Sequence, residues 1–252
     1  MTPYSTPFQA GESLLFAIRW GAITGGYSTL SVNPLDLTSS TVAYHIISEA
    51  RSTGIVDTFY HVEDRNEAWL DAIRPRSLRY EKNLHEGKYR AHQIVELDQV
   101  QHSFIEQEER FDKQSFEHKQ GAIPPDVLDI LSSLYYVRTQ PLAVGLSYTI
   151  DVHSGAKTWP LLVRVTKRER VKVKAGRFDC FRLEPLLREP GIFIPKGKKL
   201  MVWVTADDRH LPVLMRSEVF IGHVSAELVR EQPVLPPNTD RVSQPLLSSG
   251  LN

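Results

Sequence analysis

The stretch that decides the fold runs from Thr158 to Pro185 and reads TWPLLVRVTKRERVKVKAGRFDCFRLEP. Apolar side chains recur in it at alternate positions: Leu161, Val163, Val165, Val171 and Val173. Basic side chains stand between them: Arg164, Arg168, Arg170 and Lys172. A period of two is typical of a long strand with one solvated face. Because Lys174-Ala175-Gly176 supplies a turn signal, we expect the chain to run back and complete a long antiparallel hairpin.

Strand-like patterns dominate the rest of the chain as well. The segments concerned are 14–20, 27–32, 41–50, 58–70, 78–85, 88–97, 101–110, 147–153, 200–204, 213–217 and 219–228. One helix is predicted after Pro124-Pro125, capped by Asp126 and continuing to Tyr136 at helical spacing. We therefore expect a mainly β protein: a single strongly curved antiparallel sheet (an open barrel, half-barrel or sandwich) with one main helix.

Composition bounds the domain count and the partners. The 252 residues contain 30 basic and 30 acidic side chains, so the balanced charge gives no reason to expect nucleic acid as a partner. Residues 1–230 are expected to form one β-rich domain, and the proline-rich residues 231–252 a flexible tail. No apolar run of about 18 residues exists, so no transmembrane helix is expected.

The cellular location is open at this level. The first residues, MTPYSTPFQAGESLLFAIRW, lack the basic start and apolar core of a signal peptide. The protein is therefore either cytoplasmic or separated from a leader that preceded Met1. The single cysteine, Cys180, cannot form an internal disulfide and does not decide between these alternatives.

Motifs for catalysis and for metal binding are missing from the sequence. It contains no Gly-x-Ser-x-Gly nucleophile motif, no His-Glu-x-x-His motif and no phosphate-binding glycine loop. His61 and Asp64 could share a site through folding, but scattered surface positions are the favoured interpretation. Cys180 is expected to be a buried apolar side chain. We therefore expect no metal, no cofactor and no enzymatic activity; the rival enzyme hypothesis would depend on Asp64, Asp207 and Asp208.

Aromatic side chains in apolar contexts provide the candidate ligand-binding residues. They are Trp20, Tyr44, Phe59, Trp69, Tyr135 and Trp203. Most would belong to an ordinary core, but in a cupped sheet some would line a cavity for a small apolar ligand.

Charged side chains provide two further candidate groups. The basic face formed by Arg164, Arg168, Arg170 and Lys172 is either a solvated strand face or a patch for anionic headgroups or a protein partner. Arg51, Asp64 and Arg138 lie in otherwise packable segments, and buried charges must be paired. An internal ion pair is therefore predicted among them, with a ligand clamp as the alternative.

Several segments in sequence order resemble a bacterial exported family, domain of unknown function 3108. They include Pro7-Phe8-x-x-Gly11-Glu12, Ala50-Arg51-Ser52-x-Gly54, Val62-x-Asp64-Arg65, Leu134-Tyr135-Tyr136-x-Arg138 and Val173-x-Ala175-Gly176-x-Phe178-Asp179-Cys180. The likeness covers residues 7–229 and implies a cell-envelope protein similar to the half-barrels of periplasmic lipoprotein carriers. Members generally carry a secretory or lipoprotein leader, so the resemblance implies a periplasmic or outer-membrane-associated protein whose leader is missing here. It supplies no catalytic residues.

Two functions follow as expectations. The first is a non-enzymatic periplasmic binding or carrier protein for a lipid-like or other hydrophobic ligand, which could also be anionic. The alternative is a structural or assembly protein of the envelope that binds a protein partner through the basic hairpin or the tail.

Overall fold

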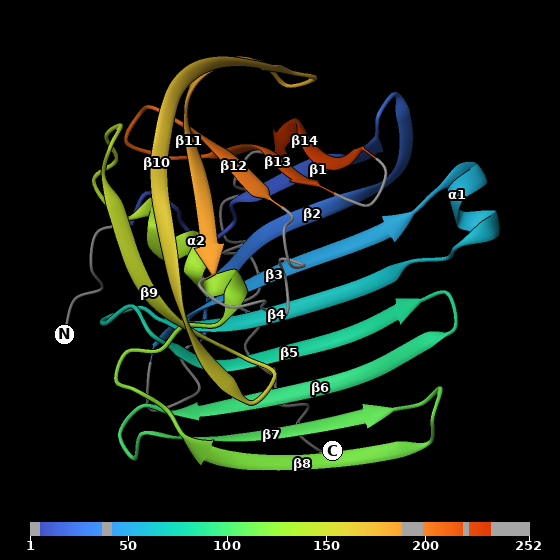
Figure 1. Ribbon diagram of the computed structural model, residues 1–252, viewed down its shortest axis with the longest axis vertical. Coiled ribbons are helices and arrows are strands. Elements are labelled where there is room, and N and C mark those ends of the chain that lie inside the picture. The colour runs from blue at the N-terminus through green and yellow to red at the C-terminus, as the bar shows by residue number, and fades with distance from the viewer. Residues whose placement is uncertain (1–5, 37–41, 188–198, 219–221, 233–252) are drawn as a thin grey trace, which may run out of the picture.

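A computed structural model describes residues 6–36, 42–187, 199–218 and 222–232 of the chain. These residues form one antiparallel sheet of fourteen strands (Figure 1). The strands of the first half are β1 (Ser13–Trp20), β2 (Ile23–Asp36), β3 (Ala43–Ser52), β4 (Glu63–Asp71), β5 (Ser77–Glu86), β6 (Tyr89–Asp98), β7 (Ser103–Arg110) and β8 (Ser115–Ala122). Those of the second half are β9 (Ser147–Ser154), β10 (Lys157–Val173), β11 (Gly176–Leu187), β12 (Leu200–Thr205), β13 (Pro212–Glu218) and β14 (His223–Gln232).

The strand order explains the shape of the sheet. It runs β8 to β1, then β14 down to β9, so the first and last strands pair at its centre while β8 and β9 form its two edges. The sheet bends strongly but does not close into a barrel (Figure 1). The predicted fold class is confirmed.

The hairpin of β10 and β11 forms as the alternating sequence predicts. Its strands pair from Leu161 opposite Leu187 to Val173 opposite Gly176. Gly176 has a positive φ of 145°, a conformation that other residues rarely adopt. A register shift between Val165 and Lys167 marks a bulge, and bulges increase the local bend of a strand. The hairpin can therefore curve over the rest of the sheet, as Figure 1 shows.

The core lies inside the bend, around the helix α2 (Ile130–Arg138). Tyr135 of α2 is fully buried, and its ring meets the ring of Phe8 edge-on at 4.8 Å. The segment before α2 connects two distant strands: Ser77 N donates to the Val127 carbonyl, while Leu128 pairs with Val152 of β9. The helix is thus fixed inside the sheet rather than packed on its outside.

The start of α2 differs from the prediction. Asp129, not Asp126, is the N-cap, and its carboxylate accepts a hydrogen bond from Ser132 N at 2.8 Å. Val127 and Leu128 are buried beside β5 and β9, so the helix cannot begin until that bridge has ended. Asp126 instead forms an ion pair with Arg74 at 2.7 Å.

Three other segments also differ from the predicted pattern. Residues 58–70 were expected to be extended throughout, but Gly54–Phe59 forms a second, short helix, α1, and β4 begins only at Glu63. The polar strand β8 is absent from the predicted strands, because all eight of its residues are exposed and show no apolar alternation. Strand β14 continues through Gln232, two residues beyond the expected domain boundary; residues 219–221 and 233–252, which include most of the expected tail, lie outside the described residues.

Neither helix in the described part of the chain is long and apolar enough to cross a lipid bilayer.

Candidate functional site

An apolar hollow of about 590 Å³ lies at the end of the sheet that carries α1. Ile18 and Trp20 reach it from β1, on the same face of that strand as the buried Leu14 and Phe16. Val224 of β14 lies opposite Trp20 in the sheet and also contributes to the lining. The hollow is therefore an extension of the inner face of the sheet beyond the packed core.

The helix α1 forms the outer wall of the hollow. Its residues Ile55 and Phe59 are 69% and 83% exposed, although both are large and apolar. Trp20 and Tyr60 are each about half exposed beside them. Clustered exposed apolar side chains are unusual on a soluble surface and mark binding sites for ligands, membranes or proteins.

Two glycines of β2 allow close approaches beside the hollow, Gly26 to the neighbouring strand β3 and Gly25 to α1. A Cβ at Gly26 would lie 2.3 Å from the carbonyl oxygen of Arg51, so no other residue fits there without movement of the backbone. A Cβ at Gly25 would lie 3.4 Å from Val56 of α1. A register shift in the pairing of β1 with β2 occurs between Ile18 and Arg19 at this point.

The six aromatic residues proposed to line a cavity do not share one environment. Trp20 and Phe59 line the hollow, whereas Tyr44, Tyr135 and Trp203 are buried in the core. Trp69 lies on the other face of β4 and stacks on His45 with ring centroids 4.4 Å apart. The six residues therefore do not line one hollow. Trp203, for example, donates a hydrogen bond to Glu169 Oε1 at 2.9 Å and lies beneath the guanidinium of Arg216.

The predicted ion pair among Arg51, Asp64 and Arg138 does not form. Arg138 is buried, but its partner is Glu12, with N–O distances of 2.6 and 2.9 Å. Arg51 is exposed and pairs with Glu63 at 2.9 Å. The Asp64 carboxylate accepts a hydrogen bond from the backbone N–H of His85 at 3.0 Å. Arg51 and Asp64 lie on the neighbouring strands β3 and β4, but Asp64 pairs in register with Ala50 and Arg51 with Glu63, so their side chains project from opposite faces of the sheet. Arg138 lies at the end of α2 instead.

The predicted basic face lies on exposed positions of β10. Arg164, Arg168, Arg170 and Lys172 are all exposed. Acidic residues of β11 stand opposite two of them, since Arg164 pairs in register with Glu184 and Arg170 with Asp179. Arg168 also donates two hydrogen bonds to Asp179, which lower the pKa of that carboxyl. The basic charge of this face is therefore partly neutralised within the hairpin itself.

The remaining candidate groups have structural surroundings. The Cys180 thiol is fully buried, and burial raises its pKa to about 12. The Asp207 carboxylate accepts hydrogen bonds from Thr205 Oγ1 and Arg209 N and so shapes the turn between β12 and β13. Asp64 lies on β4, so the carboxylates of the enzyme hypothesis come from separate strands and turns.

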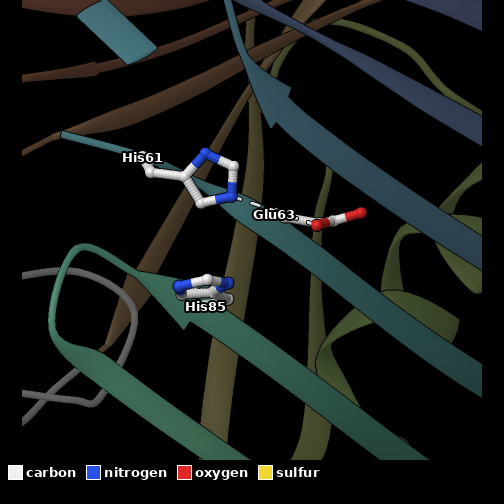
Figure 2. A group of neighbouring side chains, drawn as sticks. All are labelled: His61, Glu63 and His85. Carbon is white, nitrogen blue, oxygen red and sulfur yellow. Dashed lines mark ion pairs between the residues drawn. The ribbon is translucent and has the colours of Figure 1, made fainter. Parts of the chain in front are cut away.

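A group of metal-ligating side chains lies beside α1 on the outer face of the sheet. His61, Glu63 and His85 each offer one ligand atom, and these atoms all lie within 4.8 Å of one another (Figure 2). From the sequence, His61 and Asp64 were a possible shared site, and scattered surface positions were the favoured interpretation. A usable signal was present, because residues two apart on a strand share a face, which groups His61 with Glu63 and excludes Asp64.

Comparisons with known proteins identify the fold but no activity. The model of the family described as "Protein of unknown function (DUF3108)" matches residues 15–229. No curated protein matches the chain. Among solved structures, a β-barrel-like protein of domain of unknown function DUF1849 from Brucella abortus is similar, with a TM-score of 0.56 and 11% identity over 88% of this chain and 96% of that one. At this identity the likeness shows the fold alone.

A second solved structure is more distant. It is a Bacteroides fragilis protein with a YmcC-like fold, provisionally described as exported, with a TM-score of 0.37 and 8% identity over 92% of this chain and 100% of that one.

Proposed function

Because the chain belongs to the DUF3108 family, whose description states no activity, we propose from the site itself that it is a non-enzymatic cell-envelope protein that binds or carries a lipid-like ligand. The apolar hollow beside α1 is the observation that supports this proposal. Its volume of about 590 Å³ falls within the range of roughly 300–1,000 Å³ typical of small-ligand sites.

The position of the site differs from that of a carrier with a hollow barrel. The space inside the bent sheet is occupied by α2, whose Tyr135 is fully buried. A ligand would instead occupy the end of the inner face, between β1 and α1. Such a site is open to solvent on one side, so an apolar chain could enter it without unfolding of the core.

The charge of the lining favours an amphiphile with an anionic group. Among the described residues that line the hollow, the charged side chains are Arg19 and Arg51, both basic. Both guanidinium groups lie at the partly exposed rim, where Glu63 approaches Arg51 at 2.9 Å and Glu227 approaches Arg19 at 3.9 Å, so an anionic headgroup would compete with these carboxylates. An acyl chain with a carboxylate or phosphate headgroup matches this arrangement. Envelope location is supported by the sequence resemblance, since members of that family generally carry a leader.

Native mass spectrometry after incubation with palmitate and with a lysophospholipid tests the proposal. Wild-type protein should retain one ligand per chain, and Ile55→Asp or Phe59→Asp should abolish retention. Both side chains are exposed, so these changes should leave the fold intact. The matched control is Phe116→Asp, because Phe116 is 64% exposed on β8, away from the hollow. Absence of retention by wild type, or equal loss in the control, would overturn the proposal.

The second candidate is a structural or assembly protein. The observation that supports it is the filled interior around α2. The exposed basic face of β10 would then be the surface that contacts an acidic partner. Reversal of Arg164, Arg168, Arg170 and Lys172 to glutamate would abolish envelope-protein association if this face docks a partner. Unchanged association after the reversal would remove this candidate.

A further inference from the structure

Two neighbouring strands bring the outer-face group His61, Glu63 and His85 together. Val62 forms a bridge with Glu86, and further along β4 Arg65 pairs with Asn83 of β5. This register places Glu63 directly opposite His85. His61 precedes Glu63 by two residues in extended chain, so all three side chains project from the same face. Figure 2 shows them gathered at this end of the sheet.

His61 has the orientation of a metal ligand with a carboxylate support. Its Nδ1 lies 2.8 Å from Asp57 Oδ1, while its Nε2 faces Glu63 Oε2 at 3.9 Å. Asp57 is itself held by a hydrogen bond of 2.5 Å from Ser52 Oγ. In metal sites the second ring nitrogen of a histidine ligand typically donates to a carboxylate, which fixes the tautomer and directs the other nitrogen to the metal.

The other two ligands are also positioned by the fold. Glu63 uses Oε1 for its ion pair with Arg51, which leaves Oε2 turned toward His61. The backbone of His85 is fixed by the hydrogen bond from its N–H to the Asp64 carboxylate at 3.0 Å. The rings of His61 and His85 lie 4.7 Å apart, centroid to centroid. Partners outside the group thus orient the side chains of His61 and Glu63, while for His85 an outside partner holds the backbone.

We propose that His61, Glu63 and His85 bind a divalent first-row transition metal, with Zn²⁺ as the best match, and that Asp57 positions His61. Two imidazoles and one carboxylate are donors that suit Zn²⁺, with bond lengths of about 2.0–2.2 Å. The ligand atoms, within 4.8 Å of one another, need only small side-chain rotations to reach such bonds. Three protein ligands leave one coordination position open to solvent or to an added ligand.

Half-exposed ligands make the site accessible and its variants informative. The side chains of His61 and Glu63 are 43% and 50% exposed, so substitutions there should not disturb the core. A chain without a histidine tag, freed of metal by a chelator, is titrated with Zn²⁺ by calorimetry and with Co²⁺ by visible absorption. We expect one ion per chain and a Co²⁺ spectrum with intense ligand-field bands.

Variants separate ligation from general attraction of cations. His61→Ala, Glu63→Gln and His85→Ala should each abolish saturable binding, while Asp57→Asn should weaken it by roughly 10–100-fold. The matched control is His92→Ala. His92 lies 2.7 Å from Glu81 on the same sheet but belongs to no three-ligand group among the described residues, so its loss should leave metal affinity unchanged.

Two results would overturn the proposal: no saturable binding by the wild type, or equal loss of affinity in His92→Ala and His61→Ala. Thermal unfolding with and without Zn²⁺ supplies a second measurement, because an ion that binds only the folded chain raises its stability. A zinc-dependent rise in unfolding temperature that survives His85→Ala would also contradict the assigned ligands.

Discussion

Arg138 at the end of α2 and Glu12 just before β1 form a fully buried ion pair with two N–O contacts of 2.6 and 2.9 Å. The guanidinium also lies over the rings of Phe8 and Tyr135, at 5.3 and 5.1 Å from their centroids. This pair connects the interior helix to the centre of the sheet. Because β1 pairs with both β2 and β14 there, the position of α2 and the joining of the two sheet halves depend on the same contact.

Removal of either partner of this pair should strongly destabilise the protein. Arg138→Met leaves the buried Glu12 carboxylate with only Arg209 near it, at 4.0 Å, and should cost roughly 3–5 kcal/mol in the free energy of unfolding. The double variant with Glu12→Leu should recover most of that loss, because neither charge then remains buried. Urea unfolding of the single and double variants measures the coupling. Additive losses in the two single variants would contradict the interpretation.

His153 should make stability depend on pH. Burial lowers the pKa of its imidazole from 6.5 to about 4, and its Nε2 has no hydrogen-bond partner in the structure. In the unfolded chain this imidazole therefore becomes protonated near pH 6.5, whereas in the folded chain it becomes protonated only near pH 4. The contribution of His153 to the free energy of unfolding is fully present above pH 6.5. It decreases as the pH is lowered, by about 2 kcal/mol between pH 7 and pH 5.

The variant His153→Phe isolates this contribution. Phe104 contacts the imidazole with ring centroids 4.4 Å apart, so a phenyl ring suits the same surroundings. The free energies of unfolding of wild type and variant are measured in urea at several pH values. As the pH falls, the wild type should lose stability relative to the variant. A difference that stays constant with pH, or an equal shift for the exposed His118→Phe, would contradict the assignment.

Gly26 should resist substitution, while its neighbour Gly25 should not. The Cβ of Gly26→Ala would lie 2.3 Å from the Arg51 carbonyl, so backbone must move at a cost of roughly 1–3 kcal/mol. The Cβ of Gly25→Ala would meet Val56 at 3.4 Å, an ordinary contact distance. Thermal unfolding of the two variants should therefore separate them, and equal losses would show that the close approach of β2 to Arg51 is not the cause.

Cys180 should be unreactive in the folded protein. Its thiol is fully buried and its pKa is raised by that burial to about 12, so the reactive thiolate is scarce at neutral pH. Alkylation by N-ethylmaleimide, followed by mass spectrometry, should be negligible in buffer and complete in denaturant. Rapid alkylation under native conditions would indicate that the strand β11 opens locally.

Local sequence patterns predicted the parts of this fold that depend on neighbouring residues. The alternation from Leu161 to Val173 and the turn before Gly176 suffice to define a hairpin, and they do so here. Contacts between distant segments were not predictable in this way. Asp126 and Asp129 are equally good caps by residue type, and the choice between them depends on the bridge of Leu128 with Val152.

The candidate sites show the same limit. Arg138 stood out as a charge in a packable segment, but its partner Glu12 lies 126 residues earlier and nothing local marks it. Phe59 and Trp20 both line the hollow, but the sequence pattern placed Phe59 near the start of a strand, whereas it is the last residue of α1. The His61–Glu63 spacing did contain local information, because residues two apart in extended chain project from the same face.

The pairing of β1 with β14 also determines when the sheet can finish folding during synthesis of the chain. Ser13 pairs with Gln232, so the central seam of the sheet closes only after β14 has been synthesised. Contacts this far apart in sequence slow folding, since a very long loop must be ordered before they form. The nascent polypeptide must therefore remain without this finished sheet until β14 has left the ribosome.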